Sequence, residues 1–185
     1  RIAFAGSGSF RRTNQFGNSD LQASEVGGFQ GTIKYDVSGK SQVGISAGIS
    51  NHTTQFSTGG GGAGIIDGTT SFLRADYHHA KTRMRVFWNR SRPFLREFAV
   101  TQDPFIHTDQ WDVSAEHGFS PGNQWDLVFG GNLRRNRLRS NIYDTRRIVH
   151  DFAALFFEGA WHASDAWTLI GSGRLDWQDR SGWVG

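Results

Sequence analysis

Segments in which apolar and polar residues alternate one by one follow each other through the whole chain. Such a period of two is the signature of β-strands with two unlike faces. The connections between the segments alternate strictly in length. Short ones begin at Ser38, His79, Ser120 and Ala163, and long ones at Arg11, Thr53, Ser91, Arg135 and Gln178. In an antiparallel meander this order places every long connection at one end of the sheet, which a soluble sandwich has no reason to do.

The nine alternating segments are up to eleven residues long, and six of them run to roughly nine to eleven, the length of a strand that crosses a bilayer at barrel tilt, against about five or six in soluble sheets. They cover residues 2–10, 28–37, 42–51, 72–77, 82–89, 111–119, 125–134, 155–161 and 167–177. Outer-membrane barrels also combine tight periplasmic turns with extended outer loops. We therefore predict an all-β fold, an antiparallel up-and-down meander of about nine long strands that is part of a transmembrane outer-membrane β-barrel.

Aromatic residues gather near both ends of the expected strands, as in the two aromatic girdles of a membrane barrel. Those near short turns are Tyr35, Tyr77, Phe119, Trp125, Trp161 and Trp167, and those near long loops are Phe10, Trp88, Trp111 and Trp177. The connection from Thr53 to Thr69 contains four consecutive glycines. No Lys-Ser/Thr pair follows them, so we interpret this segment as a flexible surface loop and not as a phosphate-binding loop.

The composition agrees with a barrel and excludes a helical membrane protein. Only 37% of the 185 residues are hydrophobic, and the mean hydropathy is −0.49. No apolar run approaches the 18 or more residues that a spanning helix needs, whereas polar lumen positions dilute the average of a barrel. Cysteine is absent, and the net charge is +3 with arginines spread among acidic residues. This distribution argues against a nucleic-acid-binding protein.

Three hairpins have registers that the alternation specifies. The first is expected to pair Tyr35 with Val43 and Ile33 with Ile45, and the last to pair Trp161 with Trp167, Gly159 with Leu169 and Phe157 with Gly171. The hairpin around His79 places Arg74, Asp76, Arg83 and Arg85 on one face, which we expect to point into the lumen. Either register that fits its short turn sets Asp76 directly across from Arg83 or Arg85.

The last hairpin also carries a family resemblance. An aromatic strand ends at Trp161, a polar turn follows, and the next strand contains Gly-x-Gly-Arg-Leu-Asp at residues 171–176. This phrase resembles the barrel hairpins of TonB-dependent outer-membrane receptors, and residues 9–16 are similar to the segment where an early receptor strand enters its first long loop. The resemblance covers essentially the whole chain. It implies import of a scarce ligand, such as a ferric siderophore, cobalamin or a glycan, with energy relayed from the inner membrane.

The resemblance further implies what surrounds the chain. Residues 1–185 are expected to be a partial β-barrel domain and an internal piece of a longer protein, without its plug domain or C-terminal strand. The implied location is the outer membrane of a Gram-negative cell. The implied partners are outer-membrane lipid and lipopolysaccharide, the plug domain of the same parent chain and, indirectly, the TonB system. Other functions left open are a passive porin-type channel, a lipid-modifying barrel enzyme and a soluble carbohydrate-binding β-protein.

Two groups of arginines flank the expected outer loops and are candidate contacts for an anionic ligand. They are Arg90, Arg92 and Arg96 in one group, and Arg135, Arg137 and Arg139 in the other. The alternative is that they meet lipopolysaccharide phosphates or solvent. Positive charge is in surplus on the lumen side at Arg83 and Arg85. We expect these arginines to pair with acidic groups on the plug.

No catalytic, metal or cofactor site is expected. Ser114 and Glu116 share a strand face, but His117 points to the opposite face, so no hydrolase triad forms. Asp103, His107 and Asp109 match no known set of metal ligands, and the polarity of a loop explains them. We therefore expect a protein that is not an enzyme.

Overall fold

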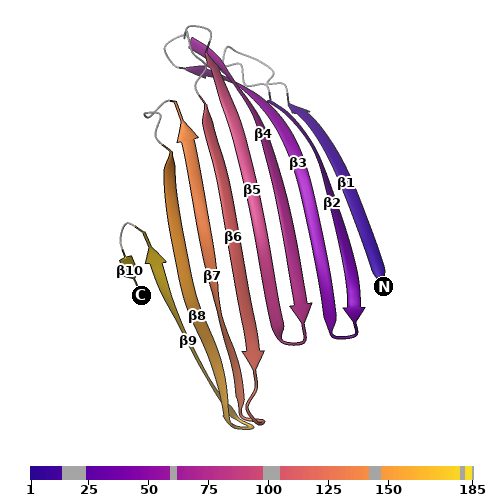
Figure 1. Cartoon of the computed structure of the whole chain (residues 1–185), viewed down its shortest axis with the longest axis vertical. Coiled ribbons are helices and arrows are strands. Elements are labelled where there is room, and N and C mark those ends of the chain that lie inside the picture. The colour runs from indigo at the N-terminus through magenta and orange to yellow at the C-terminus, as the bar shows by residue number, and fades with distance from the viewer. Residues whose placement is uncertain (14–23, 59–61, 98–104, 142–146, 180–181, 185) are drawn as a thin grey trace.

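The computed structural model describes residues 1–13, 24–58, 62–97, 105–141, 147–179 and 182–184. These residues form one antiparallel sheet whose strands pair in the order of the sequence (Figure 1). The strands are β1 (Ile2–Thr13), β2 (Ser24–Ser38), β3 (Ser41–Thr58), β4 (Gly62–His79), β5 (Thr82–Glu97), β6 (Ile106–Phe119), β7 (Trp125–Ser140), β8 (Ile148–Ser164), β9 (Trp167–Gln178) and β10 (Gly182–Val184). The predicted fold class and all nine expected strands are confirmed, and β10 is a short addition. In the described part of the chain, no helix is long and apolar enough to cross a membrane.

The strands are longer than predicted. β3 and β4 have 18 residues each, and β5 and β7 have 16. Residues 53–58, 62–69, 91–97 and 135–140, which were expected to be loops, therefore belong to strands, and this expectation is wrong. In these segments apolar and polar residues do not alternate one by one, as the adjacent pairs Ile65–Ile66 and Phe94–Leu95 show, so the pattern that marks a strand is lost. The backbone groups still need partners, and the ladder between neighbouring strands continues to supply them.

The predicted strand length of nine to eleven residues is the length of the apolar run on one face of a strand. On β1, β7, β8 and β9, alternate residues are apolar or glycine over residues 2–10, 125–133, 153–161 and 167–177. The next outward positions on the first three of these strands are charged, namely Arg12, Arg135 and Asp151. Nine to eleven residues is thus the length of each apolar run, which is the part of a strand that can face lipid.

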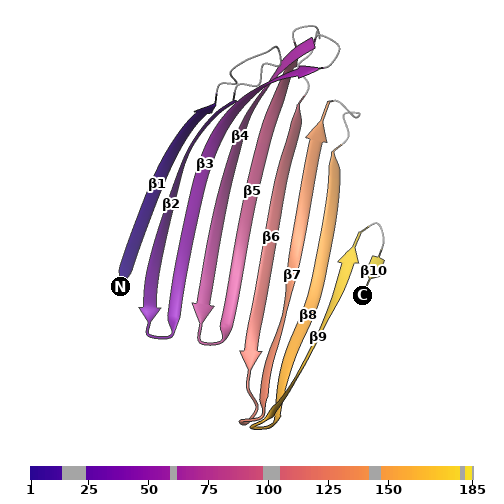
Figure 2. The same ribbon diagram turned by 180° about the vertical axis from the view of Figure 1, so that it is seen from behind.

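The sheet curves around its polar face. One hollow of about 750 Å³ is lined by side chains from Ala5 on β1 to Phe156 on β8, all but a few of them on that face. Strands so far apart in the sheet can line one hollow only if that face is concave. Figures 1 and 2 show the sheet from its two sides, with the short turns together at the lower end. The apolar residues therefore lie on the convex face, as in a barrel wall that meets lipid outside and water inside.

The structure contains almost no apolar interior. Among the described residues, Ala154 is the one apolar residue in the buried class, while Phe4 is 86% exposed and Leu133 is 63% exposed. An exposed apolar face of this extent needs lipid or another protein layer to cover it. A free-standing soluble module would instead bury these residues between two layers.

The registers of the predicted hairpins are confirmed in two cases and wrong in the third. Tyr35 opposes Val43, Ile33 opposes Ile45, and Asp76 opposes Arg85. In the last hairpin, by contrast, the pairing is offset by two residues from the prediction. The observed pairs are Trp161 with Leu169, Gly159 with Gly171 and Phe157 with Gly173.

A tighter turn and a one-residue bulge together cause this offset. The chain turns at Asp165 and Ala166, which sets Ser164 opposite Trp167 and moves the pairing by three residues. The extra residue between His162 and Ser164 then moves it back by one. Because the shift is an even number, every side chain stays on its predicted face. Trp161 packs on Trp125 of β7 instead, with the ring centroids 5.7 Å apart.

Candidate functional site

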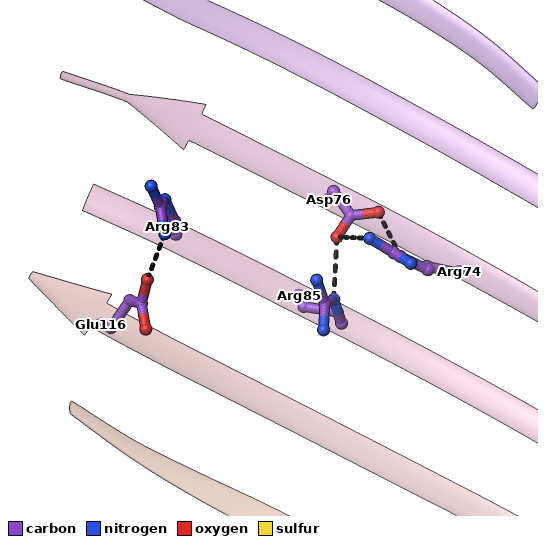
Figure 3. Close-up of polar contacts among 5 residues, drawn as sticks. All are labelled: Arg74, Asp76, Arg83, Arg85 and Glu116. Carbon is purple, nitrogen blue, oxygen red and sulfur yellow. Dashed lines mark hydrogen bonds and ion pairs between the residues drawn. The ribbon is translucent and has the colours of Figure 1, made fainter. Parts of the chain in front are cut away.

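A cluster of charged side chains lies on the concave face near the short turns. Three neighbouring strands supply it: Arg74 and Asp76 lie on β4, Arg83 and Arg85 on β5, and Glu116 on β6 (Figure 3). The register sets Asp76 opposite Arg85 and Arg83 opposite Glu116. The alternation of side chains along each strand keeps all five on one face.

Asp76 is the centre of the cluster. Its carboxylate accepts hydrogen bonds from Arg74 Nε at 2.5 Å and Nη2 at 2.9 Å. Arg85 Nε donates a third bond to the same carboxylate at 2.9 Å. One carboxylate therefore orients two guanidinium groups, which is a charge-assisted arrangement that leaves one positive charge in surplus.

Arg83 and Glu116 form the second ion pair. Arg83 Nη1 lies 3.2 Å from Glu116 Oε1, and 72% of the Arg83 side chain is exposed. An ion pair with this exposure contributes little to stability. Its guanidinium retains donors that point to the solvent of the concave side, so it is free to bind an acidic group there.

The polar hollow surrounds this cluster. Lys34, Gln42, Ser46 and Ser114 line it together with the five charged residues. Hydrogen bonds link its wall from strand to strand, for example between Thr32 Oγ1 and Ser46 Oγ at 3.0 Å. With four cationic side chains against Asp76 and Glu116, the hollow is suited to an acidic partner.

The six arginines that were predicted to bind a ligand at the outer loops lie in strands. Arg90, Arg92 and Arg96 are on β5, and Arg135, Arg137 and Arg139 are on β7, so their placement in loops is wrong. They share the convex face with the apolar rows, because they continue the alternation of Trp88 and Leu133. Three of them have carboxylate partners on neighbouring strands, in the pairs Arg90–Asp109, Arg96–Asp67 and Arg135–Asp151. The sheet itself separates them from the hollow.

Comparison with known proteins places the fold. No protein-family model and no curated protein matches the sequence. Among solved structures, the siderophore receptor PirA from Pseudomonas aeruginosa has a TM-score of 0.70 over 99% of this chain at 12% identity. The copper transporter OprC has a TM-score of 0.66 over 96% at 14% identity. P. aeruginosa FpvA, solved with pyoverdines, has a TM-score of 0.62 over 96% at 10% identity.

The chain has the barrel-wall fold of TonB-dependent receptors. It spans about a third of the length of these receptors, since it covers 32% of PirA, 32% of OprC and 33% of FpvA. The resemblance noted in the sequence is thus confirmed at the level of the fold. In such a receptor wall the concave face is the lumen side.

The remaining polar candidates lie on both faces of the sheet. Ser114 and Glu116 line the concave hollow, whereas His117 lies on the convex face and bonds to Thr82 Oγ1 at 2.7 Å. Asp103 lies outside the described residues, and in the described ranges no group of three or more His, Asp or Glu residues could hold a metal ion.

Sequence reasoning missed the acidic partners of the arginines. Glu116 was considered only as a catalytic acid, and Asp109 and Asp151 were not matched to arginines. The sequence did contain the signal for the face on which these arginines lie. Once Trp88 is assigned to the lipid side, counting by two along β5 places Arg90 on that side as well. The pairing partners, however, depend on the registers of β5 with β6 and of β7 with β8, across connections that leave the register open.

Proposed function

We propose that this chain is the barrel wall of a TonB-dependent outer-membrane receptor that imports a scarce ligand. The observation that carries the proposal is the match of 96–99% of the chain to receptor barrels, combined with an apolar convex face and a polar concave face. Two of the matched structures are named for siderophores or pyoverdines. A ferric siderophore is therefore our first candidate ligand, ahead of cobalamin and glycans.

This function includes partners beyond the chain. The wall would lie in the outer membrane of a Gram-negative cell, in contact with lipid and lipopolysaccharide. A plug domain of the same parent protein would fill the lumen, and the TonB system would act on the plug. The protein would transport and not catalyse.

Growth under iron limitation tests the proposal. Deletion of the gene is expected to abolish uptake of one ⁵⁵Fe-labelled siderophore, and deletion of the tonB gene is expected to abolish the same uptake. Uptake that persists without TonB would favour a passive porin-type channel. A protein recovered in the soluble fraction would favour a carbohydrate-binding module.

The charged cluster predicts how the wall holds its plug. In the intact protein, the double substitution Arg83→Glu and Arg85→Glu is expected to increase the rate of plug proteolysis about tenfold, because like charges would then face an acidic plug surface. Limited proteolysis with the plug fragments identified by mass spectrometry measures this rate.

A matched control is Lys40→Glu with Arg12→Glu, which changes the charge equally but lies away from the cluster. It is expected to leave the plug protected. If the Arg83/Arg85 variant also leaves plug protection unchanged, the arginines meet only water in a hydrated lumen wall.

A further inference from the structure

The upper part of the concave wall on β1–β5 carries no charge. It comprises the concave positions of residues 7–9, 28–32, 46–50, 70–72 and 87–91, which the registers place side by side above the charged cluster. At these positions the sequence has only serine, threonine, asparagine, glutamine, glycine and phenylalanine. We call this surface the neutral wall. It contrasts with the hollow below it, where four cationic and two acidic side chains lie close together.

Two phenylalanine rings form an apolar plate in the neutral wall. Phe72 on β4 and Phe87 on β5 have ring centroids 6.4 Å apart and ring planes inclined by 30°. Phe72 leans across β3, because a Cβ atom at Gly48 would lie 2.5 Å from its ring atom Cε1. Both phenylalanines are half-buried. The rings therefore lie side by side along the wall and present a flat apolar surface to the lumen.

Neutral hydrogen-bonding groups surround this plate. Thr70 Oγ1 donates to Ser91 Oγ at 3.4 Å. Gln30 Nε2 donates to Ser7 Oγ at 3.1 Å, and Asn89 lies directly opposite one of the two rings. Each hydroxyl has two lone pairs, and each amide both donates and accepts, so these groups keep capacity for a ligand in the lumen.

The charges nearest to the plate have partners within the sheet. Phe87 lies between Arg74 on one neighbouring strand and Asp112 on the other. Arg74 bonds to Asp76. Arg134 Nε bonds to Asp112 at 2.8 Å, and the side chain of Asp112 is only 15% exposed. A charged ligand at the plate would therefore have to compete with existing ion pairs.

The neutral wall lies at the outer end of the membrane-spanning part of the sheet. Trp88, between Phe87 and Asn89 on β5, belongs to the aromatic girdle near the long connections. The charged cluster lies closer to the short turns. A ligand that enters the lumen from outside the cell thus meets the neutral wall before it meets the charged cluster.

We propose that the neutral wall binds neutral sugar rings of the imported ligand. A sugar ring has an apolar C–H face, which suits a flat aromatic surface, and a rim of hydroxyl groups, which suits hydroxyl and amide side chains. A wall suited to an anion would instead expose arginine or lysine. The ligand is therefore a neutral oligosaccharide or a ferric siderophore that carries sugar groups. This inference rests on the proposed import function and narrows its candidate ligands.

Titration of the intact protein, in a detergent without a sugar headgroup, tests the site. The probes are an array of neutral and acidic oligosaccharides, a glucosylated ferric tricatechol siderophore and the same siderophore without glucose. At least one neutral oligosaccharide or the glucosylated siderophore is expected to bind, whereas the acidic oligosaccharides and the siderophore without glucose are expected to bind more weakly. Binding of an oligosaccharide without iron identifies a glycan, and binding of the glucosylated siderophore alone identifies a sugar-bearing siderophore.

The double variant Phe72→Leu and Phe87→Leu is expected to weaken this binding about tenfold, because leucine is apolar but has no flat face. The matched control Phe129→Leu and Phe157→Leu makes the same change on the convex face and is expected to bind as the wild type does. If the Phe72/Phe87 variant does not fold, Asn89→Ala is expected to weaken binding about threefold, through the loss of hydrogen bonds to sugar hydroxyls.

Wild-type affinity in the folded variant would overturn the proposal, as would failure of every neutral oligosaccharide and of the glucosylated siderophore to bind. Equal binding of the siderophore without glucose would also overturn it. Uptake separates the two proposals. TonB-dependent uptake of a ⁵⁵Fe-labelled siderophore without sugar, at the same rate in the wild type and the Phe72/Phe87 variant, refutes the sugar site alone, and the absence of any TonB-dependent uptake refutes the import function as well.

Discussion

Ile45→Arg is expected to prevent most of the protein from assembling in the outer membrane, whereas Ser46→Arg is expected to be tolerated. Ile45 is on the convex face between Ile33 and Ala75, and it is 50% exposed. Arginine at a mid-bilayer, lipid-facing position of a barrel costs about 2–4 kcal/mol. The measurement is the heat-modifiable, folded fraction of the intact protein in isolated outer membranes.

Ser46 is the matched control, one residue away on the concave face. It opposes Arg74, so a new arginine there meets a like charge across the strands. That repulsion amounts to about 1 kcal/mol at most, and water screens it. Equal folded fractions for the two variants would show that the faces are assigned wrongly.

Gly130→Ala is expected to lower the stability of the folded barrel by about 1–3 kcal/mol, as overpacking does in a closely packed site. Gly130 lies on the concave face of β7, under the ring of Phe156. A Cβ atom there would lie 2.5 Å from both the Ala115 carbonyl oxygen and Phe156 Cζ. The ring can rotate away, but the carbonyl oxygen belongs to the β6 backbone and cannot move without disturbing the ladder. The urea midpoint of the intact protein in detergent measures the effect.

Gly171→Ala provides the control, because a Cβ atom at Gly171 has nothing within 4 Å. It is expected to keep the wild-type midpoint. Combining Gly130→Ala with Phe156→Leu is expected to restore stability only in part. Full restoration would contradict the backbone contact as the cause, and an unchanged midpoint for Gly130→Ala would contradict the close packing itself.

The sequence was sufficient for features that depend on local alternation. The faces of β2 and β3 and their register follow from Tyr35, Val43 and the short turn between them, and Asp76 could be paired with one of two arginines for the same reason. Features that depend on backbone pairing alone could not be predicted. In residues 91–97 and 135–140 apolar and polar residues do not alternate, so nothing in their pattern distinguishes a strand from a loop.

The register of the last hairpin illustrates a different limit. The turn at Asp165 and Ala166 and the bulge at His162–Ser164 together change the pairing by two residues from the predicted register and leave the alternation intact. Both registers place the same side chains outward, so the hydrophobic pattern cannot distinguish them. The observed register is the one that sets the Phe157 ring over Gly173, where a side chain would leave it no room.

The length of the outward apolar runs also sets a hydrophobic thickness. Nine residues at about 3.3 Å each, tilted by about 40° from the membrane normal, span only about 20–25 Å. A typical bilayer has a hydrocarbon core of about 30 Å, and the bacterial outer membrane is thinner than average. In a thick bilayer, Arg12, Arg135 and Asp151 would be drawn into hydrocarbon, at a cost for each charge. The positions of three charged residues thus match this wall to a thin membrane, independently of any signal that directs the chain there.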